Sequence, residues 1–422
     1  MSALEHVLGE FAARPGAARS PARVAAAEAL RAHGLPAHHE ENWRYADLRA
    51  LDAAARLEPP EPPNEMLAPY PDELDGFCRL LFRNGSLGAA QARPACPGVT
   101  EIPFEEAVAS EAPSAFLRSG DGRLGLTARL LAREPLALRL DGAVSLEILS
   151  VCAAGGSFGT DWFIDVAAGA QVKLVERRLS ALPPAIAPAP TLDGHNLRVR
   201  IGPGASLAHV RLLQHVDPVV QHDTLDVSVA EGGAYRLRQV TAGAGSARSS
   251  VQVRLAGRDA SFDLRAVTAA RDRQVADAQY TILHEAPDTR SDQLFRGIAS
   301  DRAHVACSAD VQVDRAAPGA RVQQSLRGLI DGKGAEVDLR PRLTINTNEV
   351  QATHGATTGR LDEQLLFYLL ARGIDEPAAR SLLKWAFLGE ALGAIDPPAL
   401  RRAAGLAAAA RLSDAPAREL LL

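Results

Sequence analysis

The chain has 422 residues, a formal net charge of −5, 47% hydrophobic residues and only 5% aromatic residues. This length exceeds the usual size of one domain, so two or three structural units are expected. The acidic balance gives no reason to expect binding to nucleic acid. No apolar run reaches about 18 residues, so no membrane-spanning helix is predicted.

Four cysteines lie far apart and show no CxxC or comparable ligand spacing: Cys78, Cys96, Cys152 and Cys307. We therefore expect no disulfide framework, and the pattern suits a reducing cytosol. The first residues, "MSALEHVLGEF", lack the apolar core of a signal peptide. These features together predict a cytoplasmic protein.

Residues 1–71 are predicted to form an N-terminal helical region followed by a proline-rich linker. Ser20 suits a helix N-cap, Pro21 the first helical position and Gly34 the stop. Trp43 and Tyr45 are expected to pack a short following helix onto the body of the protein. The stretch "LEPPEPPNEMLAPYP" cannot hold a regular element, so it is interpreted as the linker.

Residues 72–348 are predicted to form a β core, because short segments of alternating apolar and polar residues replace the helical pattern. A Gly-Ala pair recurs between these segments, as in Gly142-Ala143, Gly169-Ala170, Gly204-Ala205 and Gly319-Ala320, with a variant at Asp259-Ala260. Glycine permits the positive φ that tight corners require. The repeat favours stacked strands in a β-helix, whereas a β-sandwich or barrel is the competing interpretation.

Residues 349–422 are predicted to form a C-terminal helical region. Asp362 suits the N-cap of a helix that stops at Gly373, and a second helix is expected to open near Asp375 and Pro377. Apolar residues at helical spacing give the second helix one apolar face. That face can pack within a small bundle, dock a partner, or do both.

Motifs for catalysis are absent: the sequence contains no GxxxxGK[ST], no GxSxG and no HExxH. His209 and His215 have the even spacing that would place them on one face of a strand. His354 lies among small and hydroxylated residues before the C-terminal helices. From these residues alone it can be a metal ligand, a proton carrier or a loop residue without chemistry.

Three segments resemble the SufB/SufD family of iron–sulfur cluster assembly proteins, and the SufD branch in particular. They are "EVQATHGATTGRLDEQLLFYLLARGI" (349–374), "HEAPDTRSDQLFRGIASDRAHVACSADVQV" (284–313) and "ENWRYADL" (41–48). The likeness is strong over about 280–390 and local at 40–48. It implies a mainly β protein, a right-handed parallel β-helix (solenoid) flanked by N- and C-terminal helices.

The resemblance also implies a function. The chain would be a non-catalytic scaffold that pairs with a SufB-like subunit through the β-helix and with a SufC-like ATPase through the C-terminal helices. We expect Leu382, Trp385, Phe387 and Leu388 to contribute to ATPase docking. Expressed alone, the chain could form a homodimer through the same β-helix edge.

The family's histidine at the SufB interface, a candidate ligand for iron or a cluster, matches His354. Relatives commonly have cysteine two residues earlier, where this chain has Ala352, so this segment supplies an imidazole without a thiolate. No cofactor is expected to stay bound to the chain alone. Iron or a cluster would be held transiently at the SufB interface, and a flavin is a further expectation for the assembled complex.

The alternative function is a β-helix lyase or hydrolase that acts on polysaccharides. Such an enzyme requires a cluster of carboxylates in a groove along one face of the solenoid. The acidic residues that come into question, Asp226, Asp263 and Asp338, are scattered along the sequence. The scaffold is therefore the leading interpretation.

Overall fold

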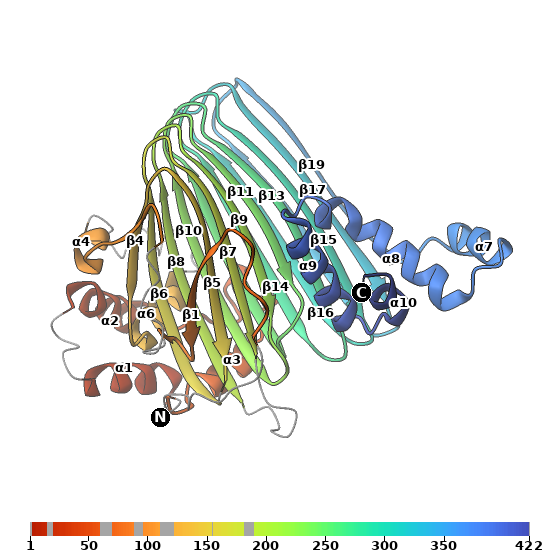
Figure 1. Cartoon of the computed structure of the whole chain (residues 1–422), viewed down its shortest axis with the longest axis horizontal. Coiled ribbons are helices and arrows are strands. Elements are labelled where there is room, and N and C mark those ends of the chain that lie inside the picture. The colour runs from red at the N-terminus through yellow and green to blue at the C-terminus, as the bar shows by residue number, and fades with distance from the viewer. Residues whose placement is uncertain are drawn as a thin grey trace.

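The centre of the protein is a parallel β-solenoid built from two sheets (Figure 1). The computed structural model describes residues 2–14, 20–59, 70–87, 96–109, 122–153, 155–180 and 190–421. From β4 to β19, successive strands alternate between the two sheets, and each strand from β6 to β17 pairs in parallel with the second strand before it and the second after it. The mainly β solenoid predicted from the sequence is confirmed, and the sandwich and the closed barrel are excluded.

The first sheet contains ten strands. They are β1 (Cys78–Arg83), β2 (Ser86–Leu87), β5 (Ala143–Cys152), β7 (Gln171–Ser180), β9 (Ser206–Gln214), β11 (Ala234–Thr241), β13 (Ser261–Ala270), β15 (Arg290–Ser300), β17 (Ala320–Asp331) and β19 (Val350–Gly359). The second sheet contains nine. They are β3 (Val99–Glu101), β4 (Leu136–Leu140), β6 (Gly156–Val166), β8 (Thr191–Ile201), β10 (Val219–Val229), β12 (Ser246–Leu255), β14 (Val275–His284), β16 (His304–Val313) and β18 (Glu336–Ile345).

The recurring glycines form the corners that follow strands of the second sheet. Gly204, with φ of 64°, turns the chain from β8 into β9, and Asp259, with φ of 59°, does the same between β12 and β13. The small residues next to them, Ala205 and Ala260, are buried inside the solenoid. A left-handed backbone and a small inward side chain therefore recur at this corner, and this recurrence is the repeat seen in the sequence.

N-terminal helices cover the outer face of the second sheet. They are α1 (Ala3–Ala13), α2 (Pro21–His33), the 3₁₀ turn η2 (Glu41–Trp43) and α3 (Leu48–Ala54), and they pack with α6 (Gly122–Leu131) against Leu192 and Val220. Ser20 caps α2 and Gly34 ends it, as predicted. The predicted linker lies partly outside the described residues, at 60–69. The segment predicted as uninterrupted β core also contains α6 and the short α4 (Phe104–Val108).

The C-terminal helices are α7 (Glu363–Ala371), α8 (Glu376–Leu392), α9 (Pro398–Arg411) and α10 (Ala415–Leu421). Helices α8 and α9 pack on the outer face of the first sheet (Figure 1). The side chains of Asp362 and Asp375 cap α7 and α8, as predicted. Within the described chain, no helix is both long and apolar enough to cross a membrane.

One expectation about the cysteines is wrong. Cys78 on β1 is joined to Cys96 by a disulfide, with Cα atoms 5.8 Å apart. Cys152 and Cys307 are buried and free. The spacing of cysteines in the sequence could not reveal this pair, because a disulfide depends on the distance between two Cα atoms in the fold.

Candidate functional site

The solenoid ends in two strands that have a partner on one side only. β18 is the last strand of the second sheet and pairs with β16, and β19 is the last strand of the first sheet and pairs with β17. Each of these edge strands has ten residues, and nearly all of β19 is exposed. We call this surface, formed by β18 and β19, the open end.

His354 lies within β19, at the open end, and not in a loop. The strands therefore continue to Gly359, past the boundary predicted at residue 348. His354 is in register with the buried Gln324, which is in register with the buried Gln293. The Nε2 atom of Gln324 donates a hydrogen bond to the Oε1 atom of Gln293 at 3.0 Å. Ala352 packs against the solenoid core, and strand alternation places His354 on the same face, at the mouth of the interior.

The interior of the solenoid contains a buried ion-pair network at the junction of β7, β8, β9 and β10. Arg211 donates from Nε and Nη2 to Glu176, both at 3.0 Å, and from Nη1 and Nη2 to Asp223 at 2.7 and 2.6 Å. All three side chains are at most 1% exposed. Burial alone would raise the pKa of both carboxyl groups, but the guanidinium beside them holds the pKa of Glu176 well below its usual value and lowers that of Asp223.

Two histidines complete this network. The Nε2 atoms of His195 and His209 lie 3.3 and 3.6 Å from the carboxylate of Glu176. Their Nδ1 atoms lie 2.6 Å from Thr160 Oγ1 and 3.2 Å from Tyr235 Oη. Desolvation lowers the pKa of both imidazoles, so both are neutral at pH 7.

Glu176, His195 and Asp223 bring metal-ligating atoms within 4.8 Å of one another. However, Arg211 donates hydrogen bonds to all four carboxylate oxygens. A divalent cation would have to displace this fixed positive charge from a fully buried position. The network is therefore a closed structural element. His215, predicted to share a face with His209, is also buried, but its Nε2 atom lies 2.9 Å from Asp193 in a separate ion pair.

The sequence itself carries a signal for this network. Charged or imidazole side chains occupy alternate positions on three consecutive strands, in the pairs Glu176/Arg178, Asp193/His195 and His209/Arg211. On each of these strands the same face carries apolar residues further along, which pack in the core. Charged residues that occupy the same alternate positions as the inward-facing apolar residues of a strand are predicted to point inward as well, which gives a polar interior.

Helix α7 projects away from the solenoid and exposes large apolar side chains (Figure 1). Phe367 is 72% exposed, Tyr368 54% and Leu365 53%, and Leu382 on α8 is 42% exposed. We call these four residues the α7 patch. Such a patch on a monomer indicates a binding surface.

The four residues predicted to dock an ATPase differ in their exposure to solvent. Leu382 is exposed, whereas Leu388 is fully buried between α8 and the first sheet. Trp385 and Phe387 are half-buried and pack against the same cluster. Leu388 therefore holds α8 on the solenoid and cannot form part of a docking surface. The helical period alone could not show which face of α8 meets the sheet.

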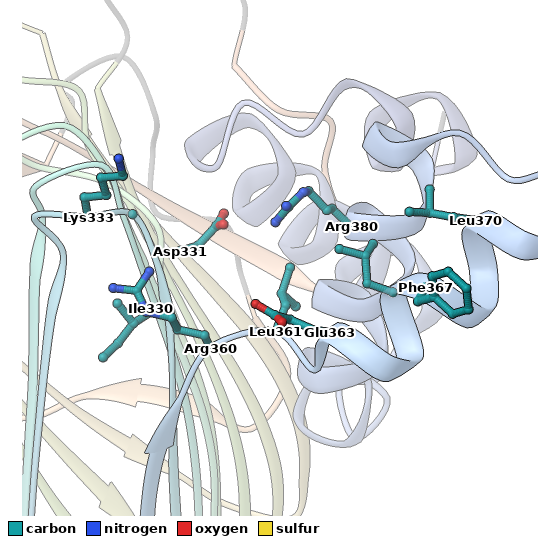
Figure 2. A pocket seen from close by; sticks show the side chains of 11 residues that line it. Ile330, Asp331, Lys333, Arg360, Leu361, Glu363, Phe367, Leu370 and Arg380 are labelled. Atoms are coloured by element: carbon teal, nitrogen blue, oxygen red, sulfur yellow. The ribbon is translucent and has the colours of Figure 1, made fainter.

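A pocket of about 510 Å³ lies between the end of β17 and helix α7 (Figure 2). Asp331 and Lys333 line it from the solenoid side, Glu363 and Phe367 from α7, and Arg380 from α8. In addition, the Nζ atom of Lys384 lies 2.6 Å from Asp331 and ties α8 to β17. The pocket thus lies between the end of β17 and the α7 patch, to which Phe367 belongs.

The segment "ENWRYADL" fastens the N-terminal region to the last coils. The guanidinium of Arg248 lies 4.4 Å from the centre of the Trp43 ring, which is 1% exposed. Glu41 pairs with Arg340 and Arg342 of β18. The packing role predicted for Trp43 is therefore confirmed, and the segment links the N-terminal helices to the strand at the open end.

The acidic residues considered for polysaccharide chemistry do not converge. Asp226, Asp263 and Asp338 lie on β10, β13 and β18, on two different sheets. The carboxylate of Asp263 is paired with Arg238 and Arg265. These three residues therefore form no carboxylate groove.

Taken together, the fold and these surfaces define a parallel β-solenoid with an unpaired terminal coil and an apolar helical appendage. The family described as "SUF system FeS cluster assembly, SufBD core domain" matches residues 152–387. The chain belongs to this family of iron–sulfur cluster assembly proteins.

Curated relatives agree with this assignment. The chain is 25% identical over 414 residues to the iron–sulfur cluster assembly protein SufD of Escherichia coli (strain K12), with 92% of each chain covered. It is 30% identical over 197 residues to an iron–sulfur cluster assembly SufBD family protein of Synechocystis, covering 47% of this chain and 44% of that protein. It is 31% identical over 214 residues to one of Mycobacterium leprae, covering 49% and 55%.

Proposed function

We propose that the chain is a non-catalytic scaffold subunit that assembles iron–sulfur clusters together with two partners. A SufB-like subunit binds at the open end, and a SufC-like ATPase binds at the C-terminal helices. The observation that carries this proposal is the open end itself, where, among the described residues, both sheets end without a further strand.

The open end supports pairing with another β-helix. A parallel strand presents a free backbone N–H and C=O at about every second residue, so each of the two ten-residue strands can form up to about ten hydrogen bonds with a matching coil. Proteins rarely leave such edges uncovered, and strand addition is a common mode of recognition. Pro341, within β18, lacks an N–H and is typical of an edge strand.

His354 gives this interface a candidate chemical role. Its side chain is exposed in the structure and lies on the face of β19 that would meet the interior of a partner solenoid. A neutral imidazole can bind ferrous iron, whereas a cluster requires several ligands, mostly thiolates. Ala352 supplies no thiolate, so the remaining ligands would come from the partner. Iron or a cluster is then a transient cargo held between two chains.

The α7 patch supports docking of the ATPase. It places Leu365, Phe367 and Tyr368 on α7 and Leu382 on α8, and α8 is fixed to the first sheet. A movement of the ATPase upon ATP binding would pull on α8 and would be transmitted to the strands beneath it. Because β13 and β15 contact α8 and are hydrogen-bonded in series to β19, this movement can reach the open end.

Co-expression with SufB-like and SufC-like proteins tests the proposal. Ala356 on β19 is in register with Leu326, which is 1% exposed inside the core. Ala356→Lys would therefore place a charge in the shared interior and should remove the SufB-like subunit from the purified complex. Thr357→Lys, one residue further and on the opposite face, is the matched control and should retain it. Retention of the partner by both variants would contradict pairing through the open end.

A further inference from the structure

We propose that the outer face of the second sheet carries a separate metal site, formed by His304, Glu336 and Asp338, that takes a divalent first-row transition metal. The site lies next to the last strand of the solenoid but does not include His354. Its existence is independent of the proposed function. Only the identity of the metal as ferrous iron rests on that function.

The backbone brings the three side chains together. His304 on β16 and Glu336 on β18 are direct partners in the parallel pairing, and Asp338 follows two residues later on the same face. The Nε2 atom of His304 lies 2.7 Å from Oδ2 of Asp338. One ligand atom from each of the three residues lies within 4.8 Å of the others. Because all three come from paired strands, their separation is set by the sheet and not by a loop.

The charge around this site is not balanced by protein groups. Among the described residues, no arginine or lysine pairs with Glu336 or Asp338, and His304 is the only ion-pair partner of Asp338. The nearest arginine in the strand, Arg340, is held by Glu41. Two carboxylates beside an imidazole thus attract a cation. This arrangement differs from the interior network, where Arg211 occupies both carboxylates.

The site is also accessible to solvent, and the orientation of its imidazole is restricted. The side chains of His304 and Asp338 are 23% and 39% exposed, so an ion can enter from solvent. The ring of Tyr45 packs edge-on against the imidazole, with the ring centres 5.6 Å apart, and restricts its orientation. One imidazole nitrogen with two carboxylate oxygens favours Fe²⁺, Mn²⁺, Co²⁺ or Zn²⁺ over Mg²⁺ and Ca²⁺, which prefer oxygen ligands alone.

Titration of the chelator-treated full chain with Co²⁺ tests the site, followed by visible absorption. The wild-type chain should bind one Co²⁺ with these ligands in the presence of millimolar Mg²⁺. His304→Ala and Asp338→Asn should each raise the Kd at least about tenfold, because each removes one of three ligands. The matched control is His33→Ala, an exposed histidine at the end of α2, which should bind as the wild type does.

Unchanged Co²⁺ binding in His304→Ala, or displacement of Co²⁺ by Mg²⁺, would overturn the site. A second measurement tests whether the site supplies iron for cluster assembly, which is a separate question from whether it binds a metal. His304→Ala in the assembled complex should lower the cluster yield only when Fe²⁺ is limiting. An unchanged yield would refute iron supply while Co²⁺ binding stands. Failure of the wild-type complex to build clusters would refute the proposed function, and the Co²⁺ result would be unaffected.

Discussion

Replacing Arg211 by leucine should destabilise the protein strongly, because Arg211 alone compensates two buried carboxylates. Its guanidinium donates to both oxygens of Glu176 and to both oxygens of Asp223, and the exposed fraction of each of the three side chains is at most 1%. Arg211→Leu leaves both acids inside the solenoid without a cation. Breaking a buried ion pair in this way costs about 3–5 kcal/mol in the free energy of unfolding.

A matched control is available on the surface. Arg254 makes the same two-pronged contact with Glu285, from Nε and Nη2 at 3.0 Å each, but the two side chains are 43% and 30% exposed. Arg254→Leu should therefore cost less than about 1 kcal/mol. The contrast between these two variants isolates the effect of burial from the loss of an arginine.

Urea unfolding at pH 7 and pH 5, followed by circular dichroism, measures both variants. Without the guanidinium, burial raises the pKa of Glu176 and Asp223 above their unfolded values, so the folded variant takes up protons as the pH falls. The difference from the wild type should therefore be largest at pH 7 and smaller at pH 5. A loss of less than 1 kcal/mol for Arg211→Leu, equal to that of Arg254→Leu, would refute the closed network.

Four further variants test other parts of the account. His222 is buried, and burial lowers its pKa to about 3. Below about pH 6.5 the unfolded chain takes up a proton at this residue and the folded chain does not, so the free energy of unfolding should fall. In urea titrations, His222→Gln should remove about 2 kcal/mol of this loss between pH 7 and pH 5. Phe367→Asp should abolish co-purification of the SufC-like ATPase without changing the melting temperature, whereas Leu388→Ala should cost about 2–5 kcal/mol of stability because it opens a cavity under α8. His354→Ala should leave complex formation intact and lower the cluster yield, and an unchanged yield would exclude His354 as a ligand.

Local features of the fold were predictable from the sequence because they depend on neighbouring residues. The caps at Ser20, Asp362 and Asp375 satisfy backbone N–H groups within one turn, so residue type and position suffice. The same holds for the corner at Gly204, where positive φ is a property of one residue. The solenoid followed from the repetition of that corner.

Features that depend on packing were harder to predict from the sequence. The helix α6 within the predicted β core, and the burial of Leu388, follow from which faces meet in three dimensions. His354 was expected in a loop because its small, hydroxylated neighbours have no apolar alternation. They form a strand because β17 offers an edge with which they pair, and they stay exposed because no further described strand covers β19.

The most direct test of the central claim is light scattering combined with size-exclusion chromatography of the chain co-expressed with SufB-like and SufC-like proteins of the same organism. The account predicts one complex that contains this chain, a SufB-like subunit and a SufC-like subunit. It also predicts loss of the SufB-like subunit in Ala356→Lys and loss of the SufC-like subunit in Phe367→Asp. Elution of the wild-type chain alone, or a complex unaffected by both substitutions, would contradict it.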